Sequence, residues 1–289
     1  MKILVIGGTG TVGSLVVQGL VAKGFSPLVL SRSPAKAAKL PEGAILVAGD
    51  LLDPYAARDA FKDVDRVFMV NAASTSEAFE GVTAVLLAKD AGVKRFVYSS
   101  THRADLTPFL PIGGATKLSV ENAIVVSDIP YTVLRPNNFF QNDLWYEASI
   151  LGDGIYPQPI GFKGMSRVDA RDIAKAAVSV LLGDGHEGKT YNITGPAVQT
   201  GLSCAAVWAA ALNRPVKYAG NDMELYARMH NFLGPALVFT YSRLLEFYQE
   251  NGLLAAEADI FDTTKLLGRG PRSLEAFAEE TARKWLAAK

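Results

Sequence analysis

A run of four aliphatic residues followed by three evenly spaced glycines is the feature that most restricts the fold of this chain. The run Ile3-Leu4-Val5-Ile6 is typical of a buried parallel strand, and Gly7, Gly10 and Gly13 follow it directly. Beyond them, apolar residues recur at helical spacing at Val12, Leu15, Val16, Gly19 and Leu20. The segment therefore predicts a strand, a tight turn and a helix whose apolar side faces a sheet.

The glycine-rich turn has the spacing of a phosphate-binding site. One glycine allows the tight bend, one lets the backbone approach a pyrophosphate, and one lets the helix pack closely on the strand. The N–H groups and the dipole at the start of the helix favour an anion. The alternative is an ordinary glycine-rich turn, but the flanking strand and helix favour dinucleotide binding. We expect contacts from Gly7, Thr9, Gly10, Thr11 and Val12.

The end of the second expected strand, residues 27–30, indicates which dinucleotide is bound. An NAD site carries an Asp or Glu there, which accepts hydrogen bonds from the ribose 2′-hydroxyl. This chain has Arg32 and Ser33 instead, with Lys36 one helical turn beyond. Guanidinium, hydroxyl and ammonium groups suit a 2′-phosphate, so we expect NADP (NADPH). The alternative for Arg32 is a solvated side chain at a helix start.

The third and fourth expected strands end in residues that could contact the cofactor. After residues 44–48, Asp50 could accept a hydrogen bond from the adenine amino group, and Leu51 could pack on the ring. The fourth strand runs into Asn71 and Ala72, which are small enough to let a cofactor lie across the strand end.

The fifth and sixth expected strands end in polar groups that could serve the reaction. Ser99 and Ser100 close the fifth strand, and His102 follows them. We expect Ser99 to contact the cofactor, whereas Ser100 and His102 could relay a proton to the substrate. An exposed loop histidine is the alternative for His102.

The segment after the sixth strand, residues 131–134, is rich in amide and aromatic side chains. Pro136, Asn138 and Phe139 are suited to a nicotinamide and to the substrate that faces it. Phe139 could equally belong to the core.

Strands and helices alternate through the first 150 residues. This alternation predicts an α/β Rossmann fold, a doubly wound parallel sheet with helices on both faces. Beyond that point mostly helical patterns prevail. We expect residues 1–150 to form a dinucleotide-binding domain, to which residues 168–195 return. Residues 151–167 and 196–289 would form a smaller, mostly helical C-terminal substrate lobe.

Composition narrows the range of partners. Net charge is zero and pI is about 6.8, so we expect no nucleic-acid partner. No apolar run approaches the ~18 residues that span a bilayer, and strand residues begin directly after Met1, so we expect neither a membrane segment nor a signal peptide. Cys204 is the only cysteine and the histidines lack metal-ligand spacing, so we expect no disulfide and no metal. These features indicate a cytoplasmic protein with a small-molecule substrate and leave its oligomeric state open.

Six segments, in order along nearly the whole chain, resemble the NmrA-like branch of the atypical short-chain dehydrogenase/reductase superfamily. They are Gly7-Gly8-Thr9-Gly10-Thr11-Val12-Gly13, Gly49-Asp50-Leu51, Val93-Lys94-Arg95-Phe96-Val97-Tyr98-Ser99-Ser100, Tyr131-Thr132-Val133-Leu134-Arg135-Pro136, Asp169-x-Arg171-Asp172-Ile173-Ala174 and Leu267-Gly268-Arg269-Gly270-Pro271-Arg272-Ser273. The resemblance implies an NADPH-dependent oxidoreductase that passes hydride to a small aromatic or conjugated acceptor, namely a quinone, an azo compound, a dye-like molecule or an enone. The alternative is an NADP(H)-binding, redox-sensing regulator without turnover, since the family contains both kinds of protein.

The catalytic motif of the commonest enzymes of the superfamily, Tyr-x-x-x-Lys, is absent. Lys117 occupies the lysine position, but Gly113 stands where the tyrosine would be. The missing phenol argues against alcohol–ketone interconversion, and less against acceptors whose reduced form is a delocalised anion. We take Lys117 as the candidate for ribose binding and for stabilising negative charge. A surface lysine paired with Glu121 at i+4 is the alternative.

Overall fold

The computed structural model describes residues 1–33, 35 and 40–287, and these residues form two compact units. The first comprises Met1–Arg135 and Ile173–Tyr191, and the second Pro136–Asp172 and Asn192–Lys289. We expected residues 136–150, 168–172 and 192–195 in the dinucleotide-binding domain, but they belong to the second unit. Local sequence patterns do not reveal these boundaries, because they depend on side-chain contacts that the segments make with distant residues.

The main sheet has seven strands in the order β3-β2-β1-β4-β5-β6-β8. Their bounds are β1 Ile3–Ile6, β2 Leu28–Ser31, β3 Ile45–Ala48, β4 Arg66–Met69, β5 Arg95–Ser99, β6 Tyr131–Pro136 and β8 Lys189–Ile193. Every pairing from β3 to β6 is parallel. The order reverses between β1 and β4, and folds of this kind bind ligands beyond the carboxyl ends of the strands at such a point.

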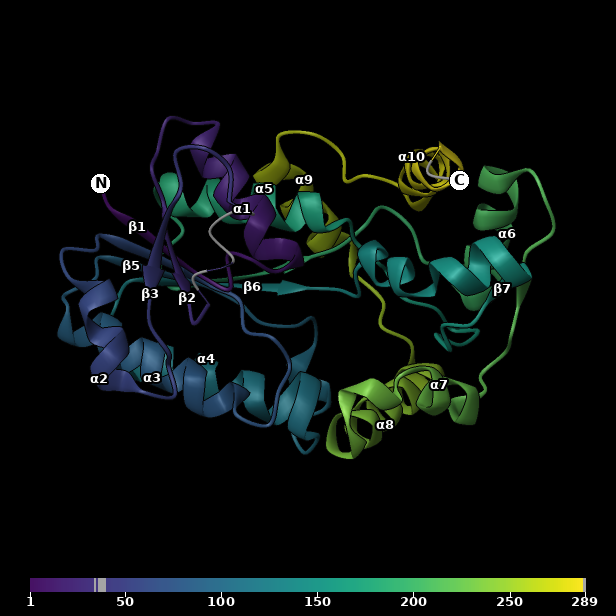
Figure 1. Ribbon diagram of the computed structural model, residues 1–289, viewed down its shortest axis with the longest axis horizontal. Helices are drawn as coiled ribbons and strands as arrows, with labels where there is room; N and C mark the ends of the chain where they lie inside the picture. Colours follow the sequence, from purple (N-terminus) through teal and green to yellow (C-terminus); the bar gives the residue numbers. More distant parts are fainter. Residues whose placement is uncertain (34, 36–39, 288–289) are drawn as a thin grey trace. The chain divides into compact units, whose positions relative to one another are not determined.

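Helices cover both faces of this sheet (Figure 1). α1 (Thr11–Val21) and α5 (Ala170–Leu182) lie on one face, and α2 (Pro54–Ala57), α3 (Glu77–Asp90) and α4 (Thr116–Val126) lie on the other. Because both faces are covered, β1 and β5 are buried along their whole length. The predicted α/β fold with a doubly wound parallel sheet is confirmed.

The second unit is mostly helical in its C-terminal part. Its further elements are β7 Ile155–Tyr156, α6 Gly201–Leu212, β9 Lys217–Tyr218, α7 Met223–Met229, α8 Pro235–Asn251, α9 Glu257–Leu267 and α10 Leu274–Ala287. Trp208 of α6 stacks on Trp285 of α10, with ring centroids 4.7 Å apart and nearly parallel planes. Among the described residues, no helix is both long and apolar enough to cross a membrane.

A buried ion pair lies at the centre of the second unit. Arg167 and Asp143 are both fully buried, with 2.7 Å between Nη2 and Oδ1. The carboxylate also accepts hydrogen bonds from the Tyr156 hydroxyl at 3.0 Å and from Trp208 Nε1 at 2.9 Å. Although burial alone would lower it, the Asp143 charge holds the pKa of Arg167 well above its ordinary value. Both charges are thus paired and hydrogen-bonded, as burial in a protein interior requires.

Asp143→Ala should strongly destabilise the protein, because it leaves the buried Arg167 guanidinium without its counter-charge. We expect the free energy of unfolding in urea to fall by about 3–5 kcal/mol. Glu224→Ala is the control, since it removes half of an exposed pair with Arg228 and should cost at most about 1 kcal/mol. Equal losses in the two variants would contradict the central role of the Arg167–Asp143 pair.

Candidate functional site

The glycine-rich turn after β1 has the geometry that a phosphate site requires. Gly7 has φ of +79°, which favours glycine, and its carbonyl accepts a hydrogen bond from the Gly10 N–H at 3.0 Å. A Cβ atom at Gly13 would lie 2.1 Å from the Gly7 carbonyl oxygen, so a side chain there would push α1 away from the turn. α1 begins at Thr11, and no side chain caps it. Its first N–H groups can therefore serve an anion.

The other residues that we expected to contact the cofactor in this turn differ in their exposure to solvent. Thr11 is exposed and Thr9 is half-buried, so both hydroxyls lie at the surface of the turn. Val12 is 3% exposed and belongs to the core. Any contact of Val12 with a phosphate would therefore come from its backbone N–H.

The end of β2 presents an exposed guanidinium. The Ser31 hydroxyl accepts a hydrogen bond from the Ser33 N–H at 3.2 Å, which holds the turn around Arg32. Arg32 is exposed, and within the described residues no carboxylate forms an ion pair with it. Lys36, the third group expected to contact a 2′-phosphate, lies outside the described residues.

Asp50 and Leu51 follow β3, as expected, but both also have structural roles. The Asp50 Oδ1 atom accepts a hydrogen bond from the Leu52 N–H at 3.0 Å. Leu51 is 6% exposed and packs in the hydrophobic core of the first unit. Little of the Leu51 side chain is thus left for an adenine ring.

Orphaned polar atoms gather where β4 and β5 end. Met69 and Tyr98 are register partners, so Asn71 and Ser100 follow the two strands at equivalent positions. The oxygens Asn71 Oδ1, Ser99 Oγ and Ser100 Oγ are buried without a hydrogen-bond partner among the described residues. Unpaired buried polar atoms are costly, so these three oxygens suit a polar ligand such as a carboxamide or a ribose. Ala72, beside them, is exposed.

His102 is fully buried. The alternative of an exposed loop histidine is therefore wrong, because the chain folds inward directly after β5. Burial keeps the imidazole away from solvent, so a role in proton transfer would have to involve neighbouring buried groups.

Lys117 is held by an ion pair between α4 and α3. Its ammonium lies 2.6 Å from the Glu77 Oε1 atom, and the two side chains are 12% and 0% exposed. The Thr116 hydroxyl donates to the other Glu77 oxygen at 3.1 Å. The ammonium also lies 5.6 Å from the centre of the Tyr98 ring, and burial raises the pKa of that phenol well above its ordinary value. Lys117 is thus fixed between Glu77 of α3 and Tyr98 near the end of β5.

The alternative for Lys117, a surface lysine paired with Glu121, is wrong on both points. Glu121 is buried and binds Arg135 of β6 through both carboxylate oxygens, with the Nε–Oε1 distance at 3.1 Å. Spacing of i+4 brings two side chains to one face of a helix, but a guanidinium from the neighbouring strand competes better for the carboxylate.

Pro136, Asn138 and Phe139 lie in the second unit; Pro136 is the last residue of β6, and the other two follow it. Arg167 donates to the Asn138 side-chain oxygen at 2.9 Å and to the Phe139 carbonyl at 2.7 Å. Pro136 is buried, whereas Asn138 and Phe139 are half-buried, so neither Asn138 nor Phe139 is fully enclosed by the core. The buried ion pair thus fixes the segment that we expected to face the nicotinamide.

Sequence reasoning missed the two residues that position these groups, Glu77 and Arg167. An acidic residue in the first turn of a helix is ordinary, so Glu77 gives no signal of a buried partner. Arg167 lies in a segment that the sequence marks only by its glycines and prolines. Within the described residues, no group of three His, Cys, Asp or Glu side chains could hold a metal ion.

A family model covers most of the chain. The model of the NmrA-like family matches residues 1–278. The chain belongs to the NmrA-like family.

Three proteins illustrate the similarity. An NAD(P)H azoreductase of Xenophilus azovorans is 34% identical over 287 residues, which are 97% of this chain and 98% of the relative. The (4-alkanoyl-5-oxo-2,5-dihydrofuran-3-yl)methyl phosphate reductase of Streptomyces griseus is 32% identical, with 97% and 98% covered. The crystal structure of an Escherichia coli NADPH-dependent quinone oxidoreductase complexed with NADPH superposes with a TM-score of 0.85 at 25% identity, covering 96% and 99%.

Proposed function

We propose that this protein is an NADPH-dependent oxidoreductase that transfers hydride to a small aromatic or conjugated acceptor. Quinones, azo compounds, dye-like molecules and enones are the acceptors to test. The observation that carries the proposal is the similarity to the NAD(P)H azoreductase along 97% of the chain. The relatives named for reduction of a quinone and of an unsaturated lactone fit the same chemistry.

The first unit would provide groups for the phosphates of NADPH and for its nicotinamide half. The N–H groups at the start of α1 would bind the pyrophosphate, and Arg32 with Ser33 would bind the 2′-phosphate. The unpaired oxygens of Asn71 and Ser99 would bind the ribose and carboxamide of the nicotinamide half. When bound, NADPH supplies the hydride. The second unit would then serve as the substrate lobe.

Lys117 would act on charge and position rather than as a proton donor. Its ammonium would hold the nicotinamide ribose and stabilise negative charge that forms on the acceptor. The Glu77 carboxylate neutralises part of the positive charge of the Lys117 ammonium and keeps the ammonium in place. No phenol stands four residues before Lys117, which fits acceptors whose reduced form delocalises its charge and needs no strong local acid. Ser100 and His102 would supply protons only through buried contacts.

NADPH should bind at least tenfold more tightly than NADH, a difference of about 1.4 kcal/mol or more, because Arg32 would pair with the 2′-phosphate. Fluorescence titration of both cofactors measures the difference. Arg32→Asp should reverse the preference, since its carboxylate would repel the phosphate and accept from a free hydroxyl. Arg228→Asp, an exposed position of the second unit, is the control and should leave the preference unchanged. Equal affinities of the unmodified protein for the two cofactors would exclude the 2′-phosphate assignment.

A panel of acceptors tests turnover itself. Quinones, azo dyes, triphenylmethane dyes and enones are mixed with the protein and NADPH, and loss of NADPH absorbance is followed. An enzyme should consume NADPH repeatedly with at least one class. Tight NADP(H) binding with every acceptor untouched, together with retention of a protein partner, would instead support the regulatory alternative.

Lys117→Ala should lower turnover by about 10²-fold, the scale expected for one preorganised electrostatic group. The same change leaves Glu77 buried and unpaired, so lost stability could also reduce activity. A double variant, Lys117→Met with Glu77→Gln, removes both charges and should restore stability without restoring turnover. Recovery of turnover in the double variant would show that Lys117 is only structural.

A further inference from the structure

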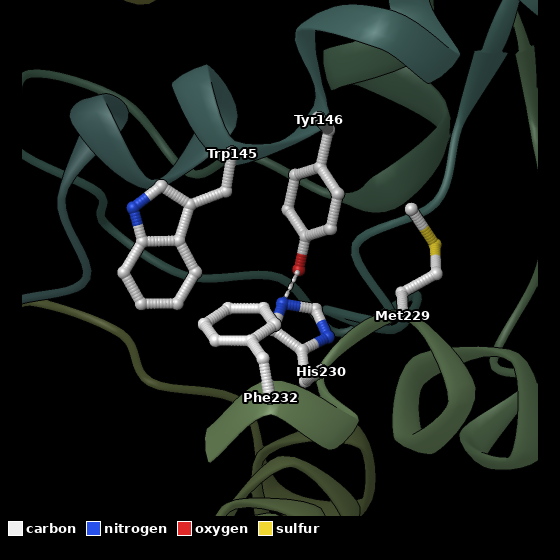
Figure 2. A pocket seen from close by; sticks show the side chains of 5 residues that line it. All are labelled: Trp145, Tyr146, Met229, His230 and Phe232. Carbon is white, nitrogen blue, oxygen red and sulfur yellow. Dashed lines mark hydrogen bonds between the residues drawn. The ribbon is translucent and has the colours of Figure 1, made fainter.

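A cavity of about 390 Å³ lies within the second unit (Figure 2). Two segments form it: the 3₁₀ helix η5 (Phe140–Tyr146) and the chain from the end of α7 into the short 3₁₀ helix η7 (Asn231–Leu233). The side chains that line it are four rings and a thioether, from Trp145, Tyr146, Met229, His230 and Phe232. This size and this lining are typical of a pocket for a small organic ligand.

Three of the rings lie close together at angles to one another. The Trp145 and Phe232 centroids are 6.2 Å apart in an edge-to-face arrangement, and both rings lie about 6 Å from His230. Aromatic groups attract one another at such distances in tilted or edge-to-face geometry. A further planar ring can therefore find favourable contacts in this cavity.

The two outermost rings are poorly covered by the protein itself. Trp145 is 59% exposed and Phe232 is 69% exposed, although both are large and apolar. Their exposure leaves apolar area that a bound ligand would remove from water.

The inner wall is polar but uncharged. His230 Nδ1 donates a hydrogen bond to the Tyr226 carbonyl at 2.8 Å. Nε2 of the neutral ring therefore accepts a hydrogen bond from the Tyr146 hydroxyl at 3.2 Å. His230 is 2% exposed, and burial lowers its pKa. Burial also raises the pKa of the Tyr146 phenol well above its ordinary value. None of the lining residues therefore carries a charge at neutral pH that would select an ionic ligand.

We propose that this cavity binds the planar, uncharged ring system of the hydride acceptor, which would lie against the exposed Trp145 and Phe232 rings with one edge toward the Tyr146–His230 pair. Identification of this ligand as the acceptor rests on the proposed reductase function. The binding itself depends only on the second unit. A cationic ring system would gain from the faces of the aromatic rings, but no carboxylate lines the cavity to pair with its charge.

Binding is measured by isothermal titration calorimetry of the full-length protein without NADPH, so that no turnover occurs. Menadione, an uncharged naphthoquinone, is the probe, and its fully saturated analogue is the matched control ligand. Trp145→Ala and Phe232→Ala should each weaken menadione binding by about tenfold. Phe239→Ala removes a similarly exposed ring that does not line the cavity, and it should change nothing. Because the replaced rings are exposed, the variants should keep their fold, which circular dichroism checks.

The possible results separate the cavity from the reaction. Weaker binding in both cavity variants, with little binding of the saturated analogue, supports the proposal even if no acceptor is reduced, in which case only the reductase function fails. Undiminished binding in both variants, or no menadione binding at all, overturns the proposal, whether or not NADPH is consumed. Tighter binding of cationic malachite green than of menadione also overturns it, because it would show selection for charge.

Discussion

The second unit depends on one buried contact, the pair of Arg167 and Asp143. Both side chains are fully buried, and the pair joins two segments that lie 24 residues apart in the sequence. Asp143 accepts from Trp208, whose ring stacks on α10, while Arg167 donates to the backbone and side chain that follow β6. Buried ion pairs add little net stability compared with apolar packing, but loss of one partner is costly. Together with the backbone hydrogen bonds that join Val168 to Asn138 and Phe140, the pair holds the segment from Asn138 to Asp143 in place.

The first unit uses the same principle at Lys117. Without a partner the Lys117 side chain near the end of β5 could adopt many rotamers, and the ion pair with the Glu77 carboxylate restricts them. Such restriction lowers the entropy that must be lost when a ligand binds. In both units, then, a group that could face a ligand is positioned by a buried charged residue: Glu77 holds Lys117, and Arg167 holds Asn138.

The fold of the first unit could be predicted because short local sequence patterns determine its elements. The second unit could not be predicted in the same way, because contacts between distant residues determine it. The aliphatic run before Gly7 lies within a single strand, and the helical spacing of apolar residues lies within a single helix. Each pattern is local, so the fold around it could be predicted. Glu77 and Lys117 lie on different helices, and no sequence period relates them. The i+4 rule instead pointed to Glu121, which Arg135 binds. Residues 136–150 were misplaced for the same reason, since their partner Arg167 is recognisable only once the chain has folded.

The contrast between the buried centre of the second unit and its exposed rings has an evolutionary consequence. Trp145 and Phe232 contribute little to the core, so their replacement costs little folding free energy, whereas changes at Arg167 or Asp143 threaten the fold. Substitutions at Trp145 and Phe232 can therefore be tolerated while Arg167 and Asp143 stay unchanged. A lineage built on this unit can diversify its ligands by drift at a few surface positions, without first acquiring compensating stability elsewhere.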